Sequence, residues 1–99
     1  MISSLRGILI DKQADGAVIE CGGGGYGVAM PISSLVRMGQ LGDEVKVLVE
    51  TSLSQDALRL FGFLEASERD VFRVLVGING VGPKLALAVL SVFSAEELC

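Results

Sequence analysis

Residues 71–92 have the sequence VFRVLVGINGVGPKLALAVLSV, and this stretch decides the fold of the second part of the chain. Apolar residues recur at helical spacing before Gly77 and again after Pro83. Gly80 and Gly82 lie between these two positions, in a segment that no helix interior would contain. The stretch therefore predicts two helices joined by a tight turn. The first helix ends near Gly77, and the second begins at Pro83, where a missing N–H is harmless.

The turn between these helices has the layout of a helix-hairpin-helix phosphate clamp. Gly80 and Gly82 permit a tight turn and the close approach of a DNA backbone, and we expect a positive φ at Gly82. The N–H groups that open the second helix point toward an anion, and Lys84 adds a charge on the same side. The predicted DNA-binding residues are Asn79, Gly80, Val81, Gly82 and Lys84. Contacts of this kind address phosphates, so binding should not depend on base sequence.

The spacing alone leaves a second interpretation of this turn open. The segment Gly80–Pro83 is then only a sharp connection between two packed helices, and Lys84 is a solvated surface residue. The flanking helices and the lack of bulky side chains in the turn favour the clamp.

Two nucleotide-binding motifs are approximated but not matched. Residues 77–84 resemble a P-loop, but Pro83 stands where Lys should follow the last Gly, and Leu85 replaces the Mg²⁺-binding hydroxyl. Residues 22–27 satisfy G-x-G-x-x-G, yet residues 28–31 continue as a strand and end in proline. We interpret the glycines as a flexible turn between strands.

The first 63 residues have the patterns of strands. Five short apolar or alternating segments are separated by turn residues, and the expected strands are residues 5–10, 17–20, 26–30, 45–50 and 57–63. Five short strands predict a small closed β-barrel of the OB-fold kind, followed by an α-helical helix-hairpin-helix segment. We place the barrel domain at residues 1–63 and the helical domain at residues 64–99. Ser94, followed by acidic residues, predicts the N-cap of a third helix that the chain leaves incomplete.

Composition narrows the class of protein. A chain of 99 residues that is 51% hydrophobic and 20% charged folds as one compact unit or as a small barrel with an appendage. The only cysteines are Cys21 and Cys99, and there is no histidine, so neither a disulfide framework nor a zinc site is expected. No cofactor is expected, and the cysteine content suits a reducing, cytoplasmic compartment. The apolar run Gly7–Ile10 is too short for a signal peptide or a membrane span.

The formal net charge of −4 argues against nucleic-acid binding over most of the surface, because counterion release favours binding only where Lys and Arg are clustered. Any DNA binding must therefore be local. The absence of histidine also removes the commonest general base at neutral pH, so we do not expect an enzyme.

The polar segment Leu53-Ser54-Gln55-Asp56 forms the predicted tip between the fourth and fifth strands. By itself it is an ordinary hairpin loop.

Residues 1–7 (MISSLRG), 25–28 (GYGV), 60–63 (LFGF) and above all 79–88 (NGVGPKLALA) resemble the RuvA family of bacterial Holliday-junction-binding proteins. The similarity runs over the whole chain. It implies an OB-fold first domain, a second domain with two helix-hairpin-helix motifs and a third domain that recruits the RuvB helicase motor. It also implies a homotetramer that presents one face to a four-way DNA junction.

The resemblance assigns roles to individual residues. Gly80, Gly82 and Lys84 take the role of phosphate contacts. Gln55 and Asp56 fall where the family has an acidic pin at the junction centre, and this chain departs from the family there, because Gln55 leaves Asp56 as the only carboxylate at the tip. The second hairpin and the motor-binding domain are not among these residues.

Two other functions compete with a non-catalytic junction-binding subunit. A DNA repair enzyme of the glycosylase, ligase or nuclease class would need a base or metal-binding carboxylates near the hairpin, and Glu96 and Glu97 are poor candidates. A single-stranded nucleic-acid-binding module would need exposed aromatic side chains. Tyr26, Phe61 and Phe63 are few, and we expect them in the core.

Overall fold

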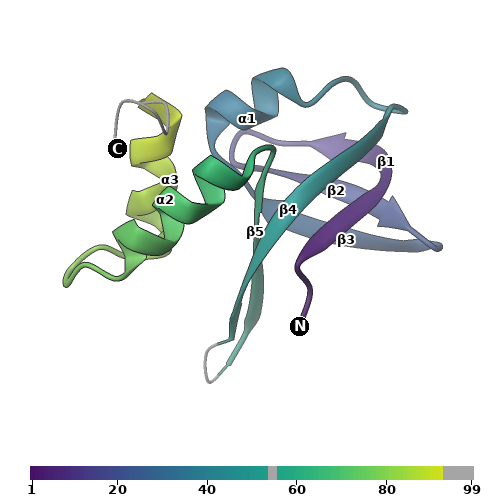
Figure 1. Cartoon of the computed structure of the whole chain (residues 1–99). Coiled ribbons are helices and arrows are strands. Elements are labelled where there is room, and N and C mark those ends of the chain that lie inside the picture. The colour runs from purple at the N-terminus through teal and green to yellow at the C-terminus, as the bar shows by residue number, and fades with distance from the viewer. Residues whose placement is uncertain (54–55, 93–99) are drawn as a thin grey trace.

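The computed structural model describes residues 1–53 and 56–92. The first part is a closed β-barrel with the strand order β1-β2-β3-β5-β4, and three helices lie beside it (Figure 1). The strands are β1 (Ser4–Lys12), β2 (Gly16–Cys21), β3 (Gly24–Ala29), β4 (Glu44–Leu53) and β5 (Leu58–Phe63). The prediction of a five-stranded OB-fold barrel followed by a helical segment is confirmed.

Antiparallel pairing joins every neighbouring pair of strands except β3 and β5, which close the barrel in parallel at Ala29 and Phe61. The β2–β3 turn uses positive φ angles of 58° at Gly22 and 87° at Gly23. Two successive positive φ angles are typical of a tight two-residue hairpin. Because β3 follows this turn directly, the glycine-rich segment is a strand connection, as the sequence predicts.

The barrel interior is a closed aliphatic core. Alternate residues of the strands point inward and are buried, among them Leu9, Ile19 and Val47, each 0% exposed. Gly62 on β5 also faces this interior, and a Cβ at that position would lie 3.2 Å from Met30 and 3.3 Å from Val28. The absence of a side chain at Gly62 therefore lets β5 lie close to the end of its neighbour β3, where Val28 and Met30 fill the interior.

A second core lies outside the barrel, between β5 and the helices α2 (Ala66–Val76) and α3 (Pro83–Val92). Phe61 and Phe63 point outward from β5 and pack on Phe72 of α2, with ring centroids 5.1 and 5.0 Å apart. Exposed fractions of 1% and 0% confirm that these two phenylalanines are core residues. Tyr26 is half-buried and packs against the barrel core.

The ends of α2 and α3 follow from local signals. Glu65 and Glu68 form a capping box at the start of α2, and Gly77 caps its C-terminus. α3 begins at Pro83. Both predicted boundaries at the turn are thus confirmed, whereas the third helix expected after Ser94 lies outside the described residues.

The short helix α1 (Ile32–Arg37) was not predicted from the sequence. It connects β3 to β4 and touches α3 as well as the barrel. The chain changes from strand to helix between Phe63 and Ala66. α2 and α3 share a core with β5, so the helices pack directly on the barrel. The division into a barrel domain at residues 1–63 and a helical domain at residues 64–99 stays a prediction.

Candidate nucleic-acid interface

The loop between α2 and α3 is a tight turn whose form is set by backbone hydrogen bonds. The N–H of Ile78 donates to the carbonyl oxygen of Leu75 at 3.1 Å, and the N–H of Val81 donates to the carbonyl oxygen of Ile78 at 3.0 Å. The second bond closes a four-residue turn with Gly80 in its third position, at φ = 86°. A positive φ in that position is the signature of a type II turn and favours glycine.

The expectation of a positive φ at Gly82 is wrong, because the left-handed residue is Gly80. Gly82 immediately precedes Pro83, and a residue before proline is driven to extended backbone. A Cβ on either Gly80 or Gly82 would meet no heavy atom within 4 Å. Both glycines therefore leave open space at the surface, through which another molecule can approach the backbone.

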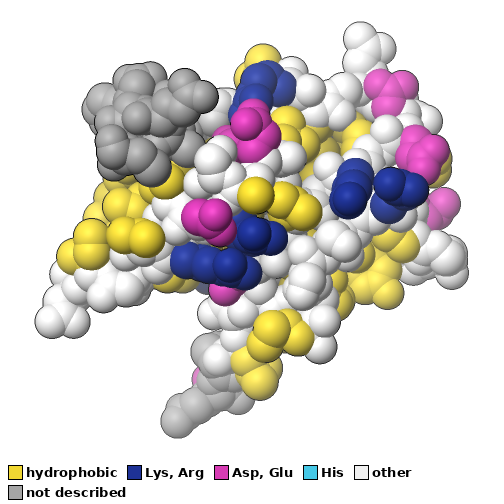
Figure 2. All heavy atoms as spheres, in the orientation of Figure 1, with side chains coloured by type: hydrophobic (Ala, Val, Ile, Leu, Met, Phe, Trp, Pro, Cys, Tyr) yellow, Lys and Arg dark blue, Asp and Glu magenta, His cyan; other side chains and the backbone are white. Residues whose placement is uncertain are grey.

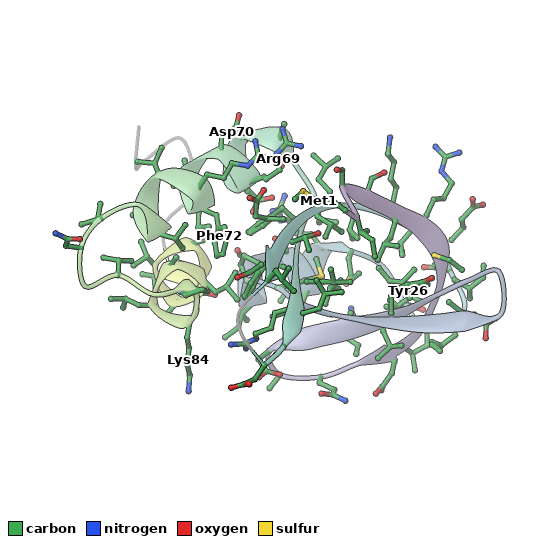
Figure 3. The ribbon with its side chains drawn as sticks, turned by 90° about the horizontal axis from the view of Figure 1, so that it is seen from below. Met1, Tyr26, Arg69, Asp70, Phe72 and Lys84 are labelled. Carbon is green, nitrogen blue, oxygen red and sulfur yellow. The ribbon has the colours of Figure 1, made fainter. Side chains whose placement is uncertain are left out.

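The first turn of α3 adds hydrogen-bond donors beside this loop. Pro83 has no N–H, and the N–H of Ala86 donates to the carbonyl oxygen of Gly82 at 3.0 Å. The N–H groups of Lys84 and Leu85 precede it in the first turn, where a helix offers no intrahelical acceptor. The Lys84 side chain is exposed and projects away from the ribbon (Figure 3). Backbone donors, the positive end of a helix dipole and an ammonium group thus occupy one end of α3.

The five residues predicted to bind DNA are contiguous but not equivalent in the structure. Asn79, Gly80, Gly82 and Lys84 are exposed. Val81 is half-buried and packs against the second core, and its N–H is used in the turn. Val81 is therefore placed to anchor the loop to the helices, and its four neighbours form the accessible surface.

The β4–β5 hairpin projects beyond the barrel at the bottom of Figure 1, and the α2–α3 loop forms the lower left end of the helical pair. Asp56 is exposed near the tip of this hairpin, whereas Gln55 lies outside the described residues. Leu53 and Leu58 flank the tip and are 80% and 60% exposed. Arg59 lies on the stem, with its guanidinium carbon 5.5 Å from the centre of the Phe61 ring, and sequence reasoning did not single it out.

Most guanidinium groups elsewhere on the surface lie next to carboxylates. Arg37 pairs with Glu65 and Glu68, and Arg73 pairs with Glu50 at 2.7 Å. Figure 2 shows such dark blue and magenta side chains side by side on the visible face. Lys84 forms no ion pair with any residue in the described part of the chain. Arg6, Lys46 and Arg59 likewise form no ion pair with the described residues, so Lys84 is one of several cations available to an anion, and it is the one beside the α2–α3 loop.

Within residues 1–53 and 56–92, no three His, Cys, Asp or Glu side chains are grouped so that they could hold a metal ion. None of the helices in this part of the chain has the length and apolar composition needed to cross a membrane.

Comparison with known proteins gives a consistent result along the chain. The family model described as the RuvA N terminal domain matches residues 1–62. The Holliday junction branch migration complex subunit RuvA of Shewanella loihica is 45% identical over 97 residues, which cover 98% of this chain and 47% of that protein. The protein of the same name from Corynebacterium aurimucosum is 46% identical over 98 residues, or 99% of this chain and 48% of that protein. The chain thus spans about half the length of the curated relatives it matches.

Proposed function

The chain belongs to the RuvA N-terminal domain family, and from this premise we propose that it is a non-catalytic DNA-binding subunit that recognises four-way junctions. The observation that carries the proposal is the exposed α2–α3 loop, where the open backbone at Gly80 and Gly82 adjoins the donors and the ammonium group at the start of α3. This arrangement suits an anion that approaches closely.

The anion that fits this site is a backbone phosphate of DNA. The N–H groups of Lys84 and Leu85 hold one phosphate, and the Lys84 ammonium group contributes charge attraction and counterion release. None of these groups distinguishes one base from another. Binding is therefore independent of sequence, and the shape of the DNA determines what is bound.

The β4–β5 hairpin supplies selectivity for a junction. In a homotetramer, four copies of Asp56 gather around the fourfold axis and repel phosphates that enter the centre. A continuous duplex cannot avoid that centre, whereas the strands of an open junction diverge around it. The loop then attracts DNA, and the hairpin tip decides which DNA is accepted.

The partners follow from the family. The relatives are named as subunits of a branch migration complex, so we propose that the protein works as a tetramer in the cytoplasm with the RuvB helicase motor. The motor would be recruited through a further domain outside these residues.

A gel-shift comparison of a four-way junction and a duplex of equal length, in magnesium-free buffer, tests this function. We expect preferential binding of the junction and no dependence on its base sequence. Equal affinity for junction and duplex would refute junction recognition. Cleavage of either DNA after magnesium is added would instead support the repair-enzyme alternative.

A further inference from the structure

Helix α1 makes polar contacts with both α2 and α3 through consecutive residues. The N–H of Ile32 donates to Ser91 Oγ of α3 at 2.9 Å, and Ser33 Oγ donates to the carbonyl oxygen of Leu90 at 3.1 Å. Ser34 Oγ donates to Glu68 Oε2 of α2 at 3.1 Å. A six-residue helix between two barrel strands is thus bonded to both arms of the helical pair.

The contact with α2 is buried and charged. Ser34 is 0% exposed and Glu68 is 6% exposed. Besides Ser34, the Glu68 carboxylate accepts from Arg37 Nη2 at 3.2 Å and from the N–H of Glu65 at 3.2 Å. A carboxylate this deeply buried is tolerated only while its partners keep their geometry, because an unpaired buried charge is costly. We refer to Ser34, Arg37 and Glu68 as the α1–α2 network.

The rest of the contact between barrel and helices is mainly apolar, apart from the hydrogen bonds from α1 to α3 and the surface ion pair between Arg73 of α2 and Glu50 of β4. Phe61, Phe63 and Phe72 hold α2 against β5 through tilted ring contacts, and aromatic pairs are favourable over a range of centroid distances. A hydrogen bond weakens steeply when its angle changes. The aromatic rings therefore supply attraction, whereas the directional bonds restrict the angle at which the helical pair sits on the barrel. The α1–α2 network is the buried, charged contact among these bonds.

We infer that Ser34, Arg37 and Glu68 are positioning residues that set the α2–α3 loop relative to the β4–β5 hairpin, and hence the preference for a junction. The second clause rests on the proposed function. The loop belongs to the helical pair and the hairpin belongs to the barrel, so their separation depends on how these two parts are docked. None of the three residues contacts DNA in this scheme.

Four variants separate positioning from mere stability. Ser34→Ala and Glu68→Ala break the network. Glu68→Gln is the conservative variant, because a glutamine oxygen in the place of Oε2 can accept from Ser34 and Arg37, and only the capping bond from the Glu65 N–H to Oε1 is lost. Val71→Ala is the matched control, since Val71 is a buried residue of α2 that weakens the second core without removing a directional bond.

The first measurement needs no DNA. Spin labels at Lys46→Cys on β4 and Ala88→Cys on α3, in a Cys21→Ser, Cys99→Ser background, report the distance between barrel and helices by double electron–electron resonance. Dilution with unlabelled protein suppresses distances between chains. We expect a shifted or broadened distance distribution for Ser34→Ala and Glu68→Ala only. An unchanged distribution in both variants would overturn the inference, whether or not the protein binds junctions.

The second measurement is the ratio of junction to duplex affinity. We expect Ser34→Ala and Glu68→Ala to lower this ratio about 3- to 10-fold. Glu68→Gln should keep most of the wild-type ratio. Val71→Ala should lower the melting temperature but leave the ratio of junction to duplex affinity unchanged. If the wild-type protein shows no preference for junctions, the proposed function fails and the distance measurement alone decides on the network. If the wild type prefers junctions and the broken variants keep the same ratio, the role in selectivity is refuted and the proposed function stands.

Discussion

The α2–α3 loop and the β4–β5 hairpin both project from the molecule, at the lower left and at the bottom of Figure 1, but they are built in opposite ways. The loop presents backbone, because its two glycines carry no side chain and its lysine stands beside free N–H donors. The hairpin presents side chains, with Asp56 near its tip between exposed leucines. Under the proposed function, the first arrangement attracts phosphates and the second repels them. A protein with both can bind DNA tightly and still reject a continuous duplex.

The largest effect should come from breaking the loop at its one left-handed residue. In Gly80→Val, a β-branched side chain must adopt φ = 86° or distort the turn, which costs about 1–3 kcal/mol. If the loop reaches its binding conformation only at that cost, affinity for junction and duplex falls together by about 5- to 100-fold. Fluorescence-anisotropy titrations with both DNAs measure this loss. A loss confined to the junction would contradict a general phosphate clamp.

The same side chain placed two residues later should act differently. Gly82 precedes proline in backbone that valine adopts readily, and space for its Cβ is open. Gly82→Val should therefore lower the free energy of unfolding by at most about 1 kcal/mol, the cost of a poorer cap. We expect DNA affinity to fall about tenfold, because the side chain blocks the approach of a phosphate to the helix N-terminus. Wild-type affinity in this variant would show that DNA does not touch Gly82.

Removing the charge beside the loop should have a smaller effect. Lys84→Ala keeps the backbone donors and removes one ammonium group, so affinity at low salt should fall about fivefold for every DNA sequence. The slope of log affinity against log salt should become shallower by about one. Lys46→Ala removes an equal charge from an exposed site on β4 and serves as the control. A sequence-dependent loss in Lys84→Ala would argue against phosphate contact.

The sequence predicts the secondary-structure elements better than it predicts the conformation of the α2–α3 loop. Alternation predicted the strands, and Gly77 and Pro83 predicted the ends of α2 and α3, because these signals are local. The choice between Gly80 and Gly82 for the positive φ was wrong. It depends on which carbonyl accepts from the Val81 N–H, and the spacing of the glycines does not encode that.

Helix α1 was missed for a related reason. A six-residue helix is too short to be stable alone. Its contacts are with Glu68 and Ser91, which lie 34 and 59 residues away in the sequence from their partners in α1. No local sequence pattern therefore predicts this helix. The candidate DNA-binding residues were found by motif and resemblance, but only the structure separates the anchor Val81 from its exposed neighbours.

The smallest expected effect concerns Asp56, where the contrast between attraction and repulsion can be sharpened. Asp56→Asn removes a charge from an exposed position without changing the size of the side chain. In the proposed tetramer, repulsion between the four tips and the phosphates at the junction centre falls, so duplex affinity should rise and the junction-to-duplex ratio should drop about two- to threefold at low salt. Gln55→Glu, which adds a carboxylate at the preceding position in the sequence, should raise the ratio. Both changes should fade as added salt shortens the screening length below about 10 Å.

Asp15→Asn is the control for this prediction. It makes the same substitution at an exposed site on the β1–β2 connection and should leave the ratio unaltered. If Asp56→Asn behaves like Asp15→Asn, the tip repels nothing, and selectivity arises from the placement of the α2–α3 loops alone.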